Sequence, residues 1–279
     1  LVCLIVGIVV YANAQGLARL EAQNLALREA LDRGQNSLEV QEGELLKARE
    51  IQEALLPRQL PRLPGAEVYS QWQPSRVVSG DYFDAIRLGD SRIGICIGDV
   101  VGKSITAALL MANLQAACRA FATTTDSPAQ LCGRLNDFFC QNLAHGKFIT
   151  FFFGILELNT RHFHYCNAGH LPALVVRKSG EQATLETGGA LFGIFPGWTY
   201  EAGEIRLGPG DRLLLFTDGV VEAMDATDAQ YGLDRLAKLV REHSGSGPRE
   251  LLPALLADVA EFCRGEFHDD ATMLLLEVK

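Results

Sequence analysis

Several features are absent from this sequence, and each absence excludes a class of protein. The seven cysteines are odd in number, contain no Cys-x-x-Cys pair and lie mostly in apolar runs. A disulfide framework or a zinc site built on these cysteines is therefore not expected, and a reducing cytosol fits best. Blocks of Lys and Arg are also absent, and the net charge is −9. We therefore expect no nucleic-acid partner.

A long apolar run is missing as well. Residues 1–12 are uncharged and apolar, but twelve residues reach only about 18 Å as a helix, short of the roughly 20 residues that span a bilayer. A buried core helix or a signal-peptide remnant would fit that length. We favour the cut end of a transmembrane helix, because a polar helical segment follows at once and Tyr11 lies near its edge. The chain begins with Leu1 and its first methionine is Met111, so we expect a piece of a longer protein.

Proline is absent from residue 13 to residue 56, and this segment predicts one long helix. A heptad register with Leu17 at a and Leu20 at d places apolar residues at eight of twelve core positions. Asn24 lies at an a position, where a polar residue fixes the register of a parallel dimer. A lone amphipathic helix packed on its own domain would also fit. We favour a homodimeric coiled coil whose weak middle makes it a candidate switch element.

The periodicity changes to that of strands after Pro57, Pro61 and Pro64. Because proline cannot continue a helix, we place a boundary here. The expected domains are the end of a transmembrane helix at 1–12, a linker helix at 13–56 and a globular domain at 57–279.

The globular domain is expected to consist of strands, two helices, many strands, two helices and a last strand. The strands are expected at 66–73, 82–88, 93–99, 148–158, 162–166, 174–177, 201–207, 213–217 and 272–278, and the helices at 104–121, 128–143, 233–243 and 249–263. This order is not a βαβ alternation. It predicts an α+β fold in which antiparallel sheets are stacked between helical layers.

Four aspartates stand where apolar, β-rich runs begin or end. They are Asp81, Asp99, Asp218 and Asp269, and three of them have a glycine neighbour, which lets the backbone approach a ligand closely. Carboxylates gathered at strand ends repel one another unless a cation is present, and hard divalent ions prefer oxygen ligands. Each aspartate alone could be a turn or cap residue. Together they predict one Mg²⁺ or Mn²⁺ site.

Seven short motifs, in this order along the chain, carry a family resemblance. They are residues 49–57, 78–84, 98–103, 167–172, 208–213, 216–222 and 269–272. Through them the chain from residue 51 onward resembles the SpoIIE/RsbU branch of the PPM-type, metal-dependent serine/threonine phosphatases. No single motif is decisive, but the ordered set is specific.

The resemblance implies an α-β-β-α sandwich of two antiparallel sheets flanked by helices, with two Mn²⁺ or Mg²⁺ ions. It implies that Asp99 bridges the ions, that the backbone carbonyl of Val100 is a ligand, and that Asp81, Asp218 and Asp269 complete the coordination. A water held by the metals would attack the phosphorus of a phosphoserine in line, without a covalent phosphoenzyme.

The chain departs from the family pattern at Ser104, where glycine is usual, and we expect Ser104 to cap the following helix. The bacterial branch often lacks the phosphate-gripping arginine of the eukaryotic enzymes. Here Arg76 lies five residues before Asp81, the same offset. Arg76 is either a ligand of the substrate phosphate, which a guanidinium suits, or an exposed or interface arginine. Lys103 either lies near the phosphate or is a solvated lysine at the helix start.

Three histidines raise the question of a further metal cluster. His162 and His164 alternate on one strand face, and His170 belongs to an Asn-Ala-Gly-His turn that we take as structural. We therefore expect no metal at these histidines. Asp84 and Asp270 are neighbours of ligands, and we expect them to support the site or to form turns.

The resemblance further implies a regulatory phosphatase at the inner membrane, with its catalytic domain in the cytoplasm. Its substrate would be a phosphoserine or phosphothreonine of a STAS-type anti-anti-sigma protein in a partner-switching pathway. A sensor domain upstream in the same chain would act through residues 49–57. A catalytically silent scaffold and a hydrolase of a small phosphoester are the alternatives. The presence of all four aspartates argues against the scaffold, and the small phosphoester stays open.

Overall fold

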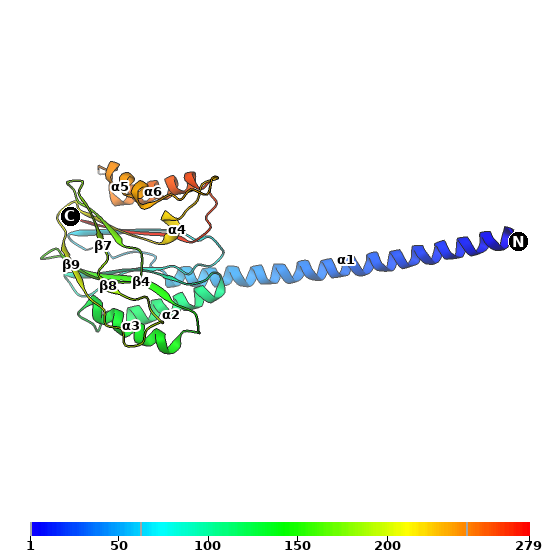
Figure 1. Ribbon diagram of the computed structural model, residues 1–279, viewed down its shortest axis with the longest axis horizontal. Coiled ribbons are helices and arrows are strands. Elements are labelled where there is room, and N and C mark those ends of the chain that lie inside the picture. The colour runs from blue at the N-terminus through cyan, green and yellow to red at the C-terminus, as the bar shows by residue number, and fades with distance from the viewer. Residues whose placement is uncertain (1, 62, 244) are drawn as a thin grey trace. The chain divides into compact units, whose positions relative to one another are not determined.

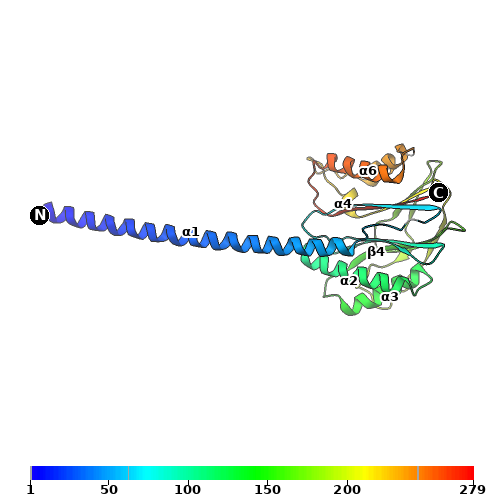
Figure 2. The same ribbon diagram turned by 180° about the vertical axis from the view of Figure 1, so that it is seen from behind.

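The computed structural model describes residues 2–61, 63–243 and 245–279, and for some of the first 30 residues it describes only the backbone. The chain divides into two compact units, Leu1–Ala48 and Arg49–Lys279. The described residues of the first unit are helical, and the second unit is the layered body in Figures 1 and 2.

Helix α1 runs from Val2 to Leu55. It ends two residues before Pro57 because a proline disfavours helical backbone in the residue that precedes it. Most side chains of residues 1–12, where we predict the end of a transmembrane helix, lie outside the described part of the structure.

Five leucines at predicted a and d positions of α1 have large exposed fractions in the single chain. They are Leu17, Leu20, Leu27, Leu31 and Leu38, each between 57% and 60% exposed. Leu25 and Leu46, which lie outside that seam, are exposed to the same degree, so the exposure does not distinguish the seam and the coiled coil stays a prediction.

The second unit contains two β-sheets within the described residues. One has the strand order β1-β11-β10-β6-β7, and the other has the order β2-β3-β4-β5-β8 with β9 paired to β5. The bounds are β1 Ala66–Gln73, β2 Tyr82–Arg87, β3 Arg92–Val100, β4 Ile149–Glu157, β5 His162–Ala168, β6 Ala173–Val176, β7 Gln182–Leu185, β8 Gly188–Gly189, β9 Gly203–Arg206, β10 Arg212–Phe216 and β11 Ala271–Val278. Neighbouring strands are antiparallel except β5 and β8, which are parallel.

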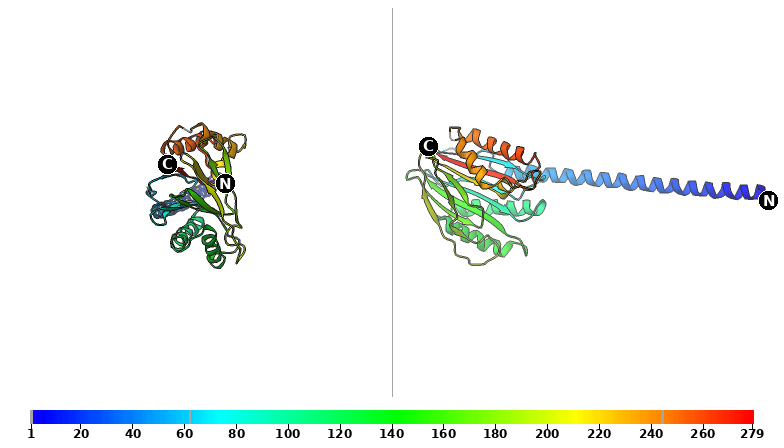
Figure 3. Two further views of the ribbon diagram at one scale, coloured as in Figure 1. Left: turned by 90° about the vertical axis from the view of Figure 1, so that its left-hand side faces the viewer. Right: turned by 45° about the horizontal axis from the view of Figure 1, so that its top comes forward.

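Helices cover the outer faces of both sheets (Figure 1; Figure 3). Helices α2 (Ile105–Ala122) and α3 (Pro128–Asn142) pack on the sheet of β2 to β5, and α5 (Leu233–Glu242) and α6 (Pro248–Phe262) pack on the other. One apolar cluster fills the space between the sheets and under α2 and α3, and a second lies under α5 and α6. This is the expected α-β-β-α sandwich, so the predicted fold class is confirmed.

Helix α2 is, among the described helices, the one long and apolar enough to cross a membrane by length and composition alone. Its side chains Met111, Leu114 and Cys118 are buried, and the helix contacts β2 and β3. Those contacts are typical of a core helix in a soluble domain.

The predicted strands and helices between residues 66 and 278 are all present, with ends that differ by at most two residues. Strands β7 and β8 and the short helix α4 (Asp218–Val221) are not predicted from the sequence. Elements of two to four residues are too short to show a periodicity, and their backbone follows from pairing with neighbours already in place.

Candidate metal centre

The four predicted aspartates meet at one end of the sandwich because of the strand pairing. Tyr82 pairs with Gly98, so Asp81 and Asp99 lie at the same end of the β2–β3 pair. Phe216 pairs with Met273, so Asp218 and Asp269 lie at the same end of the β10–β11 pair. Each sheet thus contributes two of the four aspartates.

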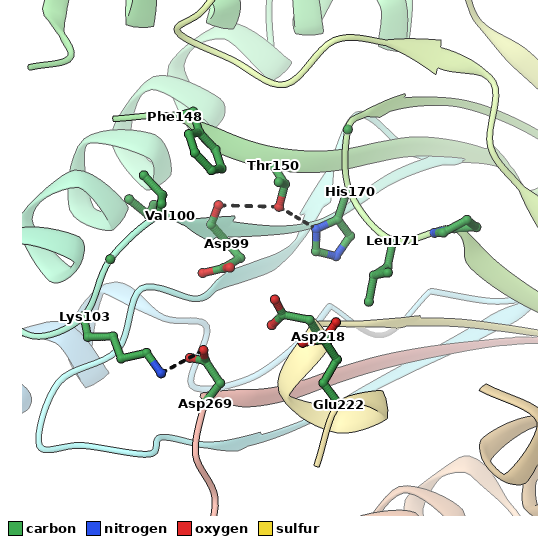
Figure 4. Close-up of a pocket in the computed structure, with 14 residues that line it drawn as sticks. Asp99, Val100, Lys103, Phe148, Thr150, His170, Leu171, Asp218, Glu222 and Asp269 are labelled. Atoms are coloured by element: carbon green, nitrogen blue, oxygen red, sulfur yellow. Dashed lines mark hydrogen bonds and ion pairs between the residues drawn. The ribbon is translucent and has the colours of Figure 1, made fainter. Parts of the chain in front are cut away.

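A cavity of about 410 Å³ opens at this end of the sandwich. The carboxylates of Asp99, Asp218 and Asp269 point toward one another in its wall (Figure 4). The lining residues also include Val100, Lys103, Phe148, Thr150, Gly169, His170, Leu171, Pro172 and Glu222. Of the predicted ligands, Asp81 is not among the described lining residues; it lies buried beside Asp99.

Asp81 has one satisfied and one unsatisfied carboxylate oxygen. Thr217 Oγ1 donates a hydrogen bond of 3.0 Å to Oδ2, and Thr272 Oγ1 donates another to the same atom. Oδ1 is buried and has no hydrogen-bond partner among the described residues. Burial, followed by the charges of Asp99 and Asp270, raises the pKa of Asp81 well above its usual value. A buried anionic oxygen without a donor requires a proton or a cation.

The carboxylates around the cavity destabilise one another's charged forms. Burial, and then the charges of Asp218 and Asp269, raise the pKa of Asp99 from 3.8 to about 7. Burial, and then the charges of Asp269 and Glu222, raise the pKa of Asp218. A bound divalent cation would remove this repulsion.

Two glycines allow the backbone to close around these carboxylates. A Cβ on Gly80 would lie 2.9 Å from the carbonyl oxygen of Val100 and 3.3 Å from Asp99 Oδ1. A Cβ on Gly219 would lie 2.2 Å from the carbonyl oxygen of Asp270. Any larger residue at either position would push apart the segments that carry the aspartates.

Asp270 anchors the loop that precedes Asp81. Its carboxylate accepts hydrogen bonds from Ser75 N at 2.7 Å, from Ser75 Oγ at 2.9 Å and from Gly80 N at 3.0 Å. Asp270 therefore supports the site. Asp84 lies outside it: its buried carboxylate pairs with Arg119 at 2.7 Å and accepts a hydrogen bond from the hydroxyl of Tyr82.

His170 forms part of the cavity wall and is held from both ring nitrogens. Its Nε2 lies 3.1 Å from the carbonyl oxygen of Phe216, and its Nδ1 lies 2.9 Å from Thr150 Oγ1. Since a carbonyl only accepts, Nε2 donates and Nδ1 accepts. Burial lowers the pKa of His170 to about 4, so the ring is neutral near pH 7. The side chain ties β4 to the end of β10, as a structural histidine does.

Lys103 is bonded to one of the predicted ligands. Its Nζ lies 2.9 Å from Asp269 Oδ2 and donates a hydrogen bond of 2.7 Å to the carbonyl oxygen of His268. This ion pair differs from both expectations for Lys103, a lysine near the phosphate and a solvated lysine at the helix start. The pair depends on β11, which lies far from Lys103 in the chain.

Arg76 is exposed, and its Nη1 donates a hydrogen bond of 3.1 Å to Ser104 Oγ. It does not belong to the described lining of the cavity, and its contact with a substrate phosphate stays a prediction.

The expectation that the side chain of Ser104 caps α2 is wrong. Ser104 is the N-cap residue, but within the described residues its hydroxyl makes no capping hydrogen bond. Its backbone has φ 71° and ψ −153°, a conformation that is essentially restricted to glycine. The glycine that is usual at this position of the family therefore fits the local backbone better than serine does.

The residues present fit divalent ions of the Mg²⁺ and Mn²⁺ type. The converging donors are carboxylate oxygens from Asp99, Asp218 and Asp269, with the Val100 carbonyl alongside. Asp81 adds a buried oxygen without a partner among the described residues. Oxygen donors in this number match the preference of hard cations.

This chain is similar to several known proteins. A family model described as Stage II sporulation protein E (SpoIIE) matches residues 89–279. The phosphoserine phosphatase RsbU of Bacillus subtilis is 30% identical over 83% of this chain and 69% of RsbU. Protein IcfG of Synechocystis sp. is 29% identical over 91% of this chain, which spans only 43% of IcfG.

Solved structures share the fold. The RsbU and RsbW domains of Rv1364c from Mycobacterium tuberculosis match with a TM-score of 0.71 and 26% identity, over 81% of this chain and 63% of that chain. The SiaA-PP2C domain of Pseudomonas aeruginosa matches with a TM-score of 0.77 and 23% identity, over 87% of this chain and 99% of that chain. The latter likeness concerns the fold alone.

The segment matched by the family model contains Asp99, Asp218 and Asp269, the three carboxylates that converge in the cavity. Since that model covers more than half of the chain, and RsbU matches most of it at 30% identity, this chain belongs to the SpoIIE family.

Proposed function

We propose that this chain is a metal-dependent protein serine/threonine phosphatase acting on a phosphorylated STAS-type anti-anti-sigma protein. The observation that carries the proposal is the convergence of Asp99, Asp218 and Asp269 in one cavity above the unsatisfied oxygen of Asp81. The relatives RsbU and RsbP of Bacillus subtilis are phosphoserine phosphatases, which supports the same chemistry here.

Two Mn²⁺ or Mg²⁺ ions would be held by the carboxylates of Asp81, Asp99, Asp218 and Asp269 and by the carbonyl of Val100, with Asp99 shared between them. When bound, such ions lower the pKa of water and neutralise charge on phosphoryl oxygens. The chain must present these carboxylates ionised. Because the pKa of Asp99 lies at about 7 without a cation, metal affinity should fall as the pH falls below 7.

Lys103 lies at the rim of the cavity. Lys103 and Asp269, which are paired, have side chains 41% and 48% exposed, so this edge is open to a phosphoserine on a protein surface. Arg76 contacts Ser104, the neighbour of Lys103. We propose Arg76 as a ligand of the substrate phosphate, because a guanidinium suits a bidentate grip on phosphate oxygens.

We also propose that the end of α1 controls the metal centre. Gln52 is buried, and its Nε2 donates a hydrogen bond of 2.7 Å to the carbonyl oxygen of Ser79. The amide of Ser79 donates one of 2.9 Å to Gln52 Oε1. The helix is thereby bonded to the residue two positions before Asp81, so a rotation of its last turn would move the loop that carries a ligand.

The input to this control would be dimerisation through residues 17–55, driven by burial of the exposed seam leucines against a second copy. A sensor upstream in the same chain would be joined to this helix through a membrane helix that ends at residues 1–12. The sensor would set how the two helices of the dimer align with each other. The catalytic unit would then lie on the cytoplasmic side.

The test is Mn²⁺-dependent phosphate release from a phosphorylated STAS protein, compared with release from a small aryl phosphate. Asp99→Asn and Asp218→Asn should each lower kcat/KM by at least about 100-fold, because each removes a charge that holds the metal. Asp90→Asn changes a fully exposed aspartate that pairs with Arg87 outside the cavity, and it should leave the rate within about threefold of wild type, as surface substitutions do.

Activity that persists in EDTA, or in both variants, contradicts the metal-dependent mechanism. A higher kcat/KM for the aryl phosphate than for the phosphoprotein would favour the small-phosphoester alternative.

A further inference from the structure

A group of metal-binding side chains lies away from the aspartate centre, on strands β5 and β9. His162 and His164 are two residues apart on β5, so both project from the same face. Glu204 on β9 is paired directly with His164. Together these three residues are called the β5–β9 cluster.

The geometry of the β5–β9 cluster brings one ligand atom of each residue within 4.8 Å of the other two. One carboxylate oxygen of Glu204 contacts His162 Nδ1, and the other lies 3.8 Å from His164 Nδ1. Donor atoms around a tetrahedral Zn²⁺ ion are about 3.4 Å apart, given Zn–N and Zn–O distances near 2.1 Å. Shifts of about 1 Å in three partly exposed side chains are therefore sufficient to bind a metal.

We propose that the β5–β9 cluster binds one Zn²⁺ ion, or a transition-metal ion of similar preference, through His162, His164 and Glu204. Two imidazoles and one carboxylate are a donor set that suits Zn²⁺ and is poorly suited to Mg²⁺. The side chains are 39%, 36% and 51% exposed, so water can reach the fourth position. The aspartate centre, with oxygen donors alone, has the opposite preference.

The charges of the residues next to the β5–β9 cluster partly cancel. Glu157 on β4 and Arg206 on β9 are both paired with His162, on opposite sides of it. Glu157 accepts a hydrogen bond from Thr160. With Glu204 the local balance is one net negative charge when both histidines are neutral, which favours a cation.

The two metal sites are separate. His162 begins β5, whereas His170, in the cavity wall, lies just beyond its other end at Ala168. Six residues of extended strand span about 20 Å. A metal in the β5–β9 cluster would therefore leave the aspartate centre untouched. It would fasten β9, a four-residue strand at the sheet edge, to β5.

From the sequence alone, no metal is expected at these histidines. The alternation of the strand places His162 and His164 on one face, but Glu204 lies some forty positions downstream, and only strand pairing places it beside them. Within the described residues, His170 is not a member of the β5–β9 cluster.

Isothermal titration of the untagged protein with Zn²⁺, in the presence of excess Mg²⁺ to compete for the aspartate centre, tests the inference. We expect one Zn²⁺ per chain, with affinity at least 10-fold weaker in His162→Ala and in His164→Ala. Co²⁺ should give the intense visible absorption of a four-coordinate, imidazole-bound ion, and both variants should lose it. His145→Ala removes an exposed histidine elsewhere and should bind like wild type.

The same titration in Asp218→Asn separates this inference from the phosphatase proposal. We expect Zn²⁺ uptake to persist there, and we expect Mn²⁺-dependent activity to persist in His164→Ala. Equal uptake by wild type and both histidine variants, or no uptake by wild type, would show that the β5–β9 cluster is an ion pair only and would overturn the inference. Circular dichroism of each variant shows whether lost binding reflects lost folding.

Discussion

At the residue scale, the two carboxylate oxygens of Asp81 lie in different environments. Thr217 and Thr272, from the ends of β10 and β11, both donate to Oδ2, while Oδ1 has no donor among the described residues. The threonines fix the orientation of the carboxylate and leave one oxygen for a cation. Without that cation, the burial of Asp81 destabilises the folded state.

The raised pKa of Asp99 makes the stability of the metal-free protein depend on pH. The folded-state pKa of about 7 lies above the usual 3.8, so between these values the folded protein holds a proton that the unfolded chain has released. The free energy of unfolding without metal should therefore fall with rising pH, by up to about 1.4 kcal/mol per pH unit for this group. His170, with its pKa lowered to about 4, acts in the opposite direction below pH 6.5.

The difference between wild type and Asp99→Asn isolates the aspartate. In EDTA, the variant should gain stability relative to wild type as the pH rises from 4 to 7, measured by urea denaturation. Added Mn²⁺ should stabilise wild type more at pH 7.5 than at pH 5.5. A constant difference between the two proteins across this range would contradict the repulsion inferred for the metal-free site.

Ser104 leads to a second residue-scale prediction. Because its φ of 71° and ψ of −153° favour glycine, Ser104→Gly should raise the free energy of unfolding by about 1 kcal/mol. Both variants lose the hydrogen bond from Arg76, but Ser104→Ala keeps the Cβ and therefore the strained backbone, so it should bring no gain. Thermal denaturation of both variants checks this, and an equal shift in the two would refute a backbone origin.

At the scale of secondary structure elements, the end of α1 is bonded to two different places. Gln52 reaches the loop of Ser79, while Gln115 of α2 donates to the carbonyl oxygen of Leu55 at 3.1 Å. The first contact leads to the metal centre, and the second holds the helix end to the domain. These two glutamines therefore allow control of the site to be separated from attachment of the helix.

Gln52→Ala should raise the Mn²⁺ concentration needed for half-maximal activity by about 10-fold or more, since a buried pair of hydrogen bonds worth about 1–3 kcal/mol no longer positions the Asp81 loop. Gln115→Ala should lower the melting temperature with little change in that concentration. If both variants changed metal dependence in proportion to their loss of stability, the contact of Gln52 would be structural only.

At the scale of the whole molecule, an acidic catalytic unit follows a long helix with leucines exposed on one seam. The heptad register divides the exposed leucines into two groups. Leu31 and Leu38 lie at a positions, whereas Leu25 and Leu46, equally exposed, lie outside the seam. A dimer through this seam should depend on the first pair and tolerate changes in the second.

If the chain dimerises through this seam as proposed, Leu31→Asp combined with Leu38→Asp should give a monomer and change the phosphatase rate. Leu25→Asp combined with Leu46→Asp adds the same charges and should leave the mass at that of a dimer. Sedimentation equilibrium and the phosphoprotein assay measure both. A monomeric seam variant with an unchanged rate would limit the helix to a tether, and equal masses for the two variants would refute the register.

The sequence by itself determined the long elements, because an alternating or 3.6-residue pattern of apolar side chains is local information. It placed β3 and β11 within two residues of their observed ends. It also singled out Asp81, Asp99, Asp218 and Asp269, since each stands at the end of such a pattern. Their grouping into one site rested on the family resemblance and on the chemistry of carboxylates.

Tertiary structure alone decided which partners these residues meet. The unsatisfied oxygen of Asp81, the Lys103–Asp269 pair and the Gln52–Ser79 bonds all join segments distant in the chain. The place of Glu204 beside two histidines has the same origin. Strand pairing sets each of these distances, and pairing depends on the packing of both sheets together, which no local pattern contains.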